Sequence, residues 1–391
     1  MSAVRKVLVQ GGGIGGLTLA TALAQRGIEV DVVEASGPEA VLGVGLNLPN
    51  NALSALEKIG VRDTCLQAGF PFEPLVIWNA ASVQVSAIPP PQGRYGSPSN
   101  TAISRPLYSG ILRDAAEKAG ARIITGATIW EMIEDGDGVE VELATWTGKR
   151  TPPLRRENAA GHRYDLVVGF DGVRSRIREH LFADAYTPRF TGFASWRVTM
   201  PRPADLTHIA FAMCKDVKAV LTPINADQMY VGLVTPEPGN PRHASSDFTR
   251  LLHERMRGFS GLLGELRDAI TDGHQISYAP LEHLVVREPW FRGRIAIAGD
   301  AAHTSPPHLA QGAAMAVEDA VTLAAALQQH SALPAALHAW FTRRRDRALF
   351  VADMSLALLK QETGTELTAE EEDLVELGIP GAQARLAQEA Y

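Results

Sequence analysis

Three glycines near the N-terminus, Gly11, Gly13 and Gly16, have the spacing of a turn that binds a dinucleotide. Glycines permit a tight turn and let a pyrophosphate approach the N-terminus of a helix, whose free N–H groups and positive dipole end favour anions. Glu34 lies at the distance along the chain where a carboxylate can accept the hydroxyl groups of an adenosine ribose. These residues predict a dinucleotide site, but they do not distinguish FAD from NAD.

The elements around these glycines must place them at the end of a buried strand. Residues 4–9 are mostly apolar and predict a short strand, and residues 14–25 have the apolar spacing of a helix that ends at Gly27. Residues 28–34 predict a second strand. The order strand, glycine turn, helix, strand is a βαβ unit, the setting in which such a turn binds a dinucleotide.

Two later segments have the same form. Residues 165–178, DLVVGFDGVRSRIR, predict a strand that runs into Asp171 and Gly172 and then a helix. Residues 293–320 predict a strand that ends at Gly299 and Asp300, a proline-containing loop, and a long helix that begins near Gly312. Ligands of open α/β sheets lie outside the carboxyl ends of the strands, so we expect all three loops to face one crevice.

Composition excludes several classes of protein. The chain has 391 residues, 46% of them hydrophobic and 21% charged, and contains no apolar run long enough for a membrane span. Its net charge is −7, without a basic stripe, so nucleic acid is an unlikely partner. The two cysteines, Cys65 and Cys214, are too few for a disulfide framework and lack metal-ligand spacing, so we expect no metal site and a reducing, cytoplasmic location.

Taken together, the GGGIGG turn with Glu34, the Asp171-Gly172 segment and the Gly299-Asp300 segment resemble the single-component FAD-dependent aromatic hydroxylases. This family is typified by p-hydroxybenzoate hydroxylase and salicylate hydroxylase. The residues PHLAQG at 307–312 are most similar to the branch of salicylate hydroxylase and 6-hydroxynicotinate 3-monooxygenase. One departure is Phe170, which stands where the family has a small residue.

The resemblance implies an α/β fold in which a Rossmann-like FAD-binding domain is interleaved with a mostly antiparallel β-sheet substrate domain, followed by C-terminal helices. The FAD-binding domain would comprise residues 1–70, 100–185 and 285–350. Residues 71–99 and 186–284 would form the substrate-binding domain, and residues 351–391 a C-terminal helical segment. A Pro/Gly/Ser-rich loop at 89–98 would separate a hairpin from the returning FAD-binding domain.

The resemblance also assigns residues to the cofactor. The glycine turn would hold the FAD pyrophosphate, Glu34 the ribose and Asp300 the ribityl chain, with Arg105 near the phosphates. The N–H groups around Gly312 and Ala313 would face the pyrimidine edge of the flavin, where negative charge develops on reduction. The complete set is Gly11, Gly13, Ile14, Gly15, Gly16, Glu34, Ala35, Gly45, Arg105, Ile129, Asp171, Gly299, Asp300, Gln311, Gly312 and Ala313.

In this family NADH or NADPH reduces the FAD, dioxygen forms a 4a-hydroperoxyflavin, and its terminal oxygen attacks an electron-rich ring. The substrate would be a phenol, a salicylate-like or a hydroxypyridine-like compound, which a general base or a field that lowers its pKa would activate. The candidate catalytic residues are His308, Pro307 and Asn47, with His308 as base or hydrogen-bond donor. A lone histidine is often merely packed, and we expect His303 to be a structural histidine.

The substrate sheet is expected between residues 188 and 279, where short strand-like stretches alternate with turns. Its candidate inward residues are Phe211, Met213, Leu221, Thr222 and Tyr230, although simple core packing explains each of them taken singly.

Two C-terminal patterns have structural explanations. Arg343, Arg344, Arg345 and Arg347 lie on a predicted helix, where we expect a solvated face or pairing with nearby acids. Thr368 followed by Glu371 predicts a capping box that opens an acidic helix closing at Gly378.

Two other functions fit the glycine turn. An NAD(P)-dependent dehydrogenase would use it for NAD, and would leave the Gly299-Asp300 segment unexplained. A non-catalytic flavin protein could act as a redox-responsive binding module. A yellow colour with absorbance near ~450 nm would exclude the first, and NAD(P)H oxidation stimulated by phenols or hydroxypyridines would exclude the second. For the hydroxylase itself we expect a monomer or homodimer.

Overall fold

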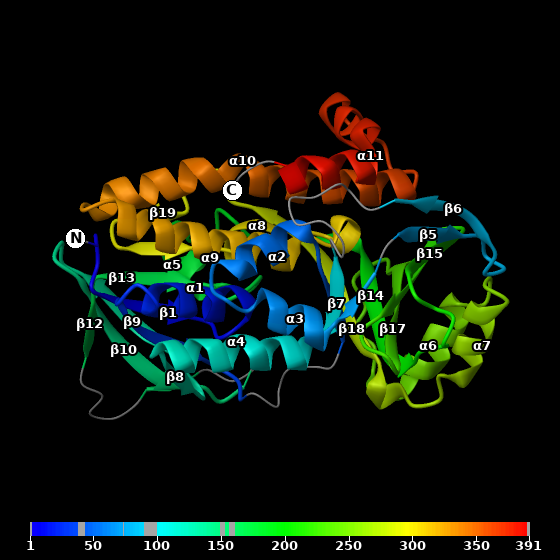
Figure 1. Cartoon of the computed structure of the whole chain (residues 1–391), viewed down its shortest axis with the longest axis horizontal. Helices are drawn as coiled ribbons and strands as arrows, with labels where there is room; N and C mark the ends of the chain where they lie inside the picture. Colours follow the sequence, from blue (N-terminus) through cyan, green and yellow to red (C-terminus); the bar gives the residue numbers. More distant parts are fainter. Residues whose placement is uncertain are drawn as a thin grey trace.

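The structure is a computed structural model that describes residues 2–37, 44–72, 74–89, 100–148, 153–155 and 161–388. Apart from Pro89, the expected proline-rich loop lies outside the described residues. Two large sheets stand side by side in Figure 1, and the long helix α10 (Leu333–Glu362) runs along both of them. The expected α/β class is confirmed.

The first sheet contains the βαβ unit predicted at the N-terminus. Its strand order is β19-β20-β13-β1-β2-β8, and every pair except β19–β20 is parallel. Its central strands are buried, as is usual for parallel strands covered on both faces. The strands are β1 (Lys6–Gln10), β2 (Glu29–Glu34), β8 (Arg122–Thr125), β13 (Leu166–Gly169), β19 (Phe291–Arg292) and β20 (Ile295–Ile297).

Helices pack around this sheet in a connected layer. Helix α1 packs against α4 and α9, and α9 packs against α2 and α10. The helices of this part are α1 (Ile14–Ala24), α2 (Asn50–Glu57), α3 (Arg62–Ala68), α4 (Arg105–Ala119), α5 (Arg176–Phe182), α8 (Asp300–His303) and α9 (Gly312–Gln329), with the short 3-10 helix η4 (Pro307–Leu309) before α9.

The second sheet is largely antiparallel, as predicted. Its order is β18-β14-β17-β16-β15-β5-β6, and only β5 and β15 pair in parallel. One face packs with α6 (Phe248–Arg255) and α7 (Leu262–Ala269) around a core that includes Trp196, Leu221 and Leu233. The strands are β5 (Leu75–Trp78), β6 (Gln84–Ile88), β14 (Arg189–Pro201), β15 (Ile209–Cys214), β16 (Val217–Pro223), β17 (Gln228–Pro236) and β18 (Ser277–Val285). Two 3-10 helices, η2 (Ser245–Asp247) and η3 (Gly273–Gln275), flank α6 and α7.

Two smaller sheets complete the fold. A three-stranded sheet joins β3 (Gly45–Leu48), β7 (Thr101–Ser104) and β4 (Phe70–Pro71). The other contains β9 (Ala127–Glu134), β10 (Val139–Thr145), β11 (Leu154–Arg155) and β12 (His162–Tyr164).

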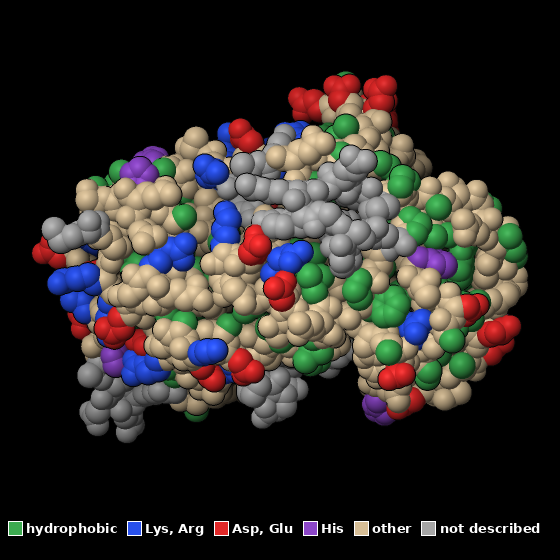
Figure 2. All heavy atoms as spheres, viewed as in Figure 1, with side chains coloured by type: hydrophobic (Ala, Val, Ile, Leu, Met, Phe, Trp, Pro, Cys, Tyr) green, Lys and Arg blue, Asp and Glu red, His purple; other side chains and the backbone are tan. Residues whose placement is uncertain are grey.

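The C-terminal helices do not begin at residue 351, because α10 continues unbroken across that position. Helix α11 (Ala369–Gln388) is interrupted at Gly378, where φ is 67°. Its predicted capping box is confirmed: the N–H of Thr368 donates to Glu371 Oε2 at 2.9 Å, and the N–H of Glu371 to Thr368 Oγ1 at 3.3 Å. Acidic side chains gather where α11 projects from the surface (Figure 2). None of the helices in the described part of the chain is both long and apolar enough to cross a membrane.

Candidate active site

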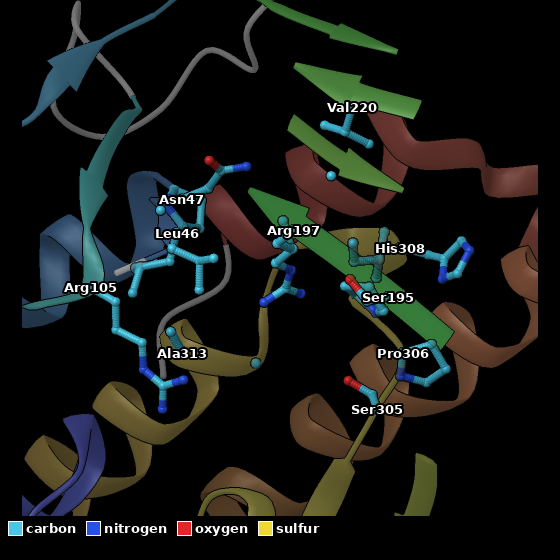
Figure 3. Close-up of a pocket in the computed structure, with 18 of the residues that line it drawn as sticks. Leu46, Asn47, Arg105, Ser195, Arg197, Val220, Ser305, Pro306, His308 and Ala313 are labelled. Carbon is cyan, nitrogen blue, oxygen red and sulfur yellow. The ribbon is translucent and has the colours of Figure 1, made fainter. Parts of the chain in front are cut away.

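A cavity of about 460 Å³ lies between the carboxyl edge of the first sheet and one face of the second. The glycine turn, Arg105 and the start of α9 line one end, and strands β14, β16 and β17 line the other (Figure 3). The predicted residues that line it are Gly13, Ile14, Gly15, Gly45, Asn47, Arg105, Phe211, Tyr230, Gly299, Asp300, Pro307, His308, Gly312 and Ala313.

The glycine turn is shaped by steric exclusion. A Cβ added to Gly16 would lie 1.9 Å from the carbonyl oxygen of Gly11, and one added to Gly11 would lie 2.3 Å from that of Phe170. Gly11 also has a φ of 108°, which L side chains rarely adopt. Gly11 and Gly16 therefore allow the close backbone contacts within and behind the turn. Gly13, in contrast, has open space on its Cβ side and lines the cavity.

Helix α1 begins immediately after this turn without a counter-charge of its own. No described side chain caps it, and its first turn contains no acidic residue. Helix α9 has the same two properties, and a Cβ on Gly312 would meet nothing within 4 Å. Each helix therefore directs unsatisfied N–H groups and the positive end of its dipole toward the cavity, an arrangement that suits an anion.

Glu34, Ala35 and Ile129 stand near the turn but do not line the cavity. Glu34 Oε2 accepts the N–H of Gly12 at 2.6 Å, and its Oε1 accepts the N–H of Ser36 at 2.8 Å. The N–H of Ile129 donates to Gln10 Oε1 at 3.1 Å. The Glu34 carboxylate is thus fixed at the end of β2, against the turn.

Asp171 and Gln311 also lie behind the cavity wall. Asp171 Oδ2 accepts the N–H groups of Arg176 at 2.8 Å and Ile177 at 3.2 Å, so this carboxylate caps α5. Burial raises the pKa of Asp171. Gln311 Oε1 accepts a hydrogen bond from Asn51 at 2.9 Å. Neither side chain lines the cavity, although their neighbours Gly172 and Gly312 do.

Asp300 is a carboxylate open to the cavity yet surrounded by protein. It follows Gly299, whose φ of 59° turns the chain from β20 into α8. Burial raises the pKa of Asp300, while the positive charge of Arg105 opposes that rise. No described residue pairs with the Arg105 guanidinium, which lines the same cavity as Asp300 and leaves a positive charge available to a ligand there.

The second sheet presents alternate residues to the cavity. Phe211 and Tyr230 line it as predicted. Leu221 does not: it packs in the core on the opposite face, because successive side chains of a strand point to opposite sides. Met213 lies toward the exposed end of β15, with 37% of its surface accessible, and Thr222 is buried outside the cavity lining.

The same two-residue period brings in side chains that the sequence reasoning missed. Ser195 and Arg197 of β14 and Lys218 and Val220 of β16 line the cavity. Arg197 is partly buried, and no described residue forms an ion pair or hydrogen bond with its guanidinium. A charged residue within the apolar strand sequence FASWRVTM was the available signal.

The three catalytic candidates have different surroundings. Pro307 and Asn47 line the cavity, and Asn47 Oδ1 is buried without a hydrogen-bond partner among the described residues. The His308 ring is buried and turned away from Arg197 and Arg105 in Figure 3. Its Nε2 lies 3.2 Å from Glu362 Oε2, and Glu362 also pairs with Lys218 at 2.6 Å. His303 Nε2 lies 2.7 Å from Asp319 Oδ2, and His303 does not line the cavity, as expected of a packed histidine.

Burial and pairing determine the charges of His308, Glu362 and Lys218, which we call the His308 cluster. Burial lowers the pKa of His308, which leaves its ring uncharged near neutral pH. Burial would raise the pKa of Glu362, but its contacts with His308 and Lys218 outweigh that effect and hold the pKa at about 2. The cluster therefore consists of a neutral imidazole, a carboxylate and an ammonium group.

The geometry fits FAD. Among the described residues, two helix N-termini without side-chain caps, a glycine cradle and an arginine without a partner line one cavity. A pyrophosphate and a reduced flavin are both anionic, which suits these groups. Within the described ranges, no group of His, Cys, Asp and Glu side chains is arranged to hold a metal ion.

Comparisons with known proteins agree with this geometry. A family model described as FAD binding domain matches residues 5–355. The chain is 30% identical to the putative FAD-dependent monooxygenase YetM of Bacillus subtilis, over 94% of this chain and 96% of the relative. It is 29% identical to 6-hydroxynicotinate 3-monooxygenase of Bordetella bronchiseptica, over 90% of each chain.

Among solved structures, Klebsiella pneumoniae HpxO, crystallised with FAD and uric acid, shares the fold. The TM-score is 0.82 at 22% identity, covering 98% of this chain and 96% of HpxO. The family match decides between the two cofactors that the glycine turn left open, since it is a match to an FAD-binding domain. The chain therefore belongs to the FAD binding domain family and is an FAD-dependent flavoprotein monooxygenase.

Proposed function

We propose that this monooxygenase hydroxylates a small aromatic or N-heteroaromatic compound whose ring carries an acidic hydroxyl group, with NADH or NADPH and dioxygen as co-substrates. The class includes phenols, salicylate-like and hydroxypyridine-like compounds. The similarity to 6-hydroxynicotinate 3-monooxygenase supports an N-heteroaromatic ring.

The proposal of an ionisable hydroxyl on the substrate rests on the position of Arg197. Its guanidinium lies on the cavity face of β14 without a partner among the described residues. A permanent positive charge beside a phenolic hydroxyl lowers the pKa of that hydroxyl, since it favours the ionised form. An ionised ring is more electron-rich, which is the condition for electrophilic oxygen transfer.

The residues along the cavity suggest how FAD would be held. We propose that Gly13 to Gly15 and Arg105 bind its pyrophosphate, that Asp300 holds the ribityl chain, and that the N–H groups of Gly312 and Ala313 face the pyrimidine edge of the flavin. Glu34 would need to exchange the N–H of Gly12 for a ribose hydroxyl, or accept both.

In this arrangement the bound FAD supplies the redox chemistry with dioxygen, which no side chain can perform. The chain's own residues position and polarise the substrate. Arg197 stabilises the ionised hydroxyl, and Phe211 and Val220 pack against the apolar part of the ring. Asn47, whose Oδ1 has no described partner, can accept a hydrogen bond from a ring N–H or hydroxyl group. We do not assign the general base to His308, because its ring faces Glu362.

We further propose a domain division, an assembly and a location. The first sheet and its helices would form the FAD-binding domain and the second sheet the substrate-binding domain, assembled from the interleaved segments 1–70, 100–185 and 285–350, and 71–99 and 186–284. The protein would act as a monomer or homodimer in the cytoplasm, where the free thiols of Cys65 and Cys214 would stay reduced.

The test is a panel of phenols, hydroxybenzoates and hydroxypyridines presented to the FAD-loaded protein. A true substrate should stimulate NADH or NADPH oxidation and yield a product heavier by one oxygen atom. Methyl ethers of the active compounds are the matched controls, since they cannot ionise. Stimulation equal for the ethers and the free hydroxyl compounds would contradict the substrate class, and oxidation that yields only hydrogen peroxide throughout the panel would contradict hydroxylation.

A further inference from the structure

Four charged side chains form a buried network between α9 and α10. Glu318 and Asp319 belong to α9, and Arg344 and Arg347 to α10. Arg344 donates to Glu318 Oε2 at 2.6 Å and to Asp319 Oδ1 at 2.8 Å, and Arg347 donates to Glu318 Oε2 at 2.7 Å. The first three side chains are fully buried. Burying charges is costly unless they are well paired, and here every charge has an opposite neighbour.

One arm of this network reaches the start of α8. Asp319 Oδ2 accepts the N–H of Gly299 at 3.0 Å and contacts His303 Nε2 at 2.7 Å. Gly299 precedes Asp300, the carboxylate open to the cavity.

On its other side, the network is linked to the start of α9 by the side-chain amide of Asn51. Asn51 Nδ2 donates to Glu318 Oε1 at 2.7 Å and to Gln311 Oε1 at 2.9 Å. Glu318 can only accept, so the nitrogen must point toward it, and both hydrogens of the Asn51 amide are used. Gln311 is the residue before Gly312 and Ala313, which line the cavity. Asn51 itself lies in the first turn of α2, which follows Asn47 and Pro49 of the facing cavity wall.

We propose that Asn51 is a positioning residue for the flavin. Its amide links Gln311 to Glu318, which the two arginines hold in place, and so fixes the N-terminus of α9 relative to the opposite wall of the cavity. This inference rests on the proposed FAD site, in which the N–H groups of Gly312 and Ala313 face the flavin. Asn51 touches neither the cavity nor the reacting atoms. It acts only through Gln311.

Removing the Asn51 amide should not break the network. Glu318 keeps both arginines as partners when Asn51 is absent, so no buried charge is left alone. The loss is local to Gln311, whose Oε1 then has no described donor. A local displacement of the α9 N-terminus weakens its electrostatic support of a reduced, anionic flavin, which makes the reduction potential of bound FAD more negative.

The experiment compares Asn51→Ala and Asn51→Leu with the wild-type protein. A leucine has nearly the shape of an asparagine but cannot donate to Glu318 and Gln311, so both variants should behave alike. We expect the dissociation constant of FAD, measured by flavin fluorescence, to rise about tenfold, the factor for one lost buried hydrogen bond. The midpoint potential of the bound flavin should move to more negative values in both.

Asn50→Ala is the matched control. Asn50 is the buried neighbour of Asn51 on α2, and its Nδ2 has no hydrogen-bond partner among the described residues. Its variant should leave the flavin potential unchanged, because no described hydrogen bond joins the Asn50 amide nitrogen to Glu318 or Gln311. Wild-type values of both FAD affinity and potential in the Asn51 variants would overturn the proposal, as would an equal shift of the potential in Asn50→Ala. Neither measurement uses a substrate, so failure of the proposed hydroxylation would be seen separately.

Discussion

At the scale of single residues, the proposed substrate class depends on Arg197, which lines the cavity. It is a cation without a described counter-charge, whereas nearby Lys218 is already neutralised by Glu362. We expect Arg197→Gln to lower kcat/KM for a phenolic substrate about 10- to 100-fold, because a hydrogen bond to a charged group contributes ~1.5–3 kcal/mol. FAD content should stay unchanged.

The control for this prediction is Arg189→Gln, since Arg189 lies exposed at the other end of the same strand, away from the cavity. Steady-state kinetics at several pH values add a second readout. If Arg197 lowers the pKa of the substrate hydroxyl in the complex, the acidic limb of the kcat profile should move to higher pH in Arg197→Gln. An unmoved limb with unchanged kcat/KM would remove Arg197 from substrate binding.

His308 gives a prediction of the opposite kind. Burial lowers its pKa from the ordinary value of 6.5, so the ring carries no charge at neutral pH, and it faces Glu362. We therefore expect His308→Gln, which keeps a donor for Glu362, to leave the shape of the kcat/KM profile between about pH 6.5 and 8 unchanged. Disappearance of an ionisation in that range would show instead that His308 is the base.

At the scale of elements, Phe170, which stands where related hydroxylases have a small residue, restricts the space beside the glycine turn. A Cβ added to Gly15 would lie 2.4 Å from the Phe170 ring, so the ring and the glycine turn occupy adjoining space. We expect Gly15→Ala to weaken FAD binding because the turn or the ring must shift. Phe170→Ala in the same chain should restore part of that binding, although removing a buried ring alone costs about 3–5 kcal/mol of stability.

A double-mutant cycle on the dissociation constant of FAD measures this coupling. We expect an interaction energy of at least ~1 kcal/mol, typical of residues in contact. Gly110→Ala is the control, since a Cβ there meets nothing within 4 Å and Gly110 lies on α4 away from the cavity. Additive effects of the two substitutions would mean that the ring and the turn do not constrain each other.

Elements whose signal is local were predictable from the sequence, and contacts between distant elements were not. The βαβ unit at β1, α1 and β2 is confirmed because strand, glycine turn and helix are contiguous. The position of Arg344 and Arg347 could be predicted only as a solvated face or as pairing with nearby acids. The pairing with Glu318 and Asp319 depends on how α10 crosses α9, which helix periodicity does not contain.

The residues of the second sheet that face the cavity were also hard to predict from the sequence alone. Leu221 and Thr222 are adjacent in β16 and cannot both face one side of a sheet, so choosing between them required the register of the strand. Arg197 was missed because a charged residue in an apolar strand signals a special position but does not show which face of the strand lines the cavity. For His308, the sequence indicated a polar group near the cavity, but its direction depends on Glu362, which is 54 positions later in the chain.

At the scale of the whole molecule, α10 joins the two halves of the structure. Near its start it packs against α9. At its end Glu362 contacts Lys218 of the second sheet and His308 of the cavity loop. Between them, Asp353 pairs with Arg287 at 3.0 Å, next to β18. Ion pairs along one helix therefore connect the helices around the first sheet to the second sheet.

These ion pairs predict how the fold responds to acid. Pairing with His308 and Lys218 outweighs burial and holds the pKa of Glu362 at about 2, against 4.5 ordinarily. A carboxyl group with a lowered pKa in the folded state stabilises the protein at and above neutral pH, and that stabilisation is lost as pH falls from about 4.5 toward about 2. In that window the unfolded chain binds one proton that the folded chain does not.

Glu362→Gln should therefore remove up to ~1.4 kcal/mol per pH unit from the slope of the unfolding free energy, and lower stability at pH 7 because Lys218 loses its partner. Urea unfolding at a series of pH values measures both effects, with Glu366→Gln, at an exposed position just beyond α10, as the control. An unchanged slope in Glu362→Gln would show that the cluster at the end of α10 does not connect the two sheets energetically.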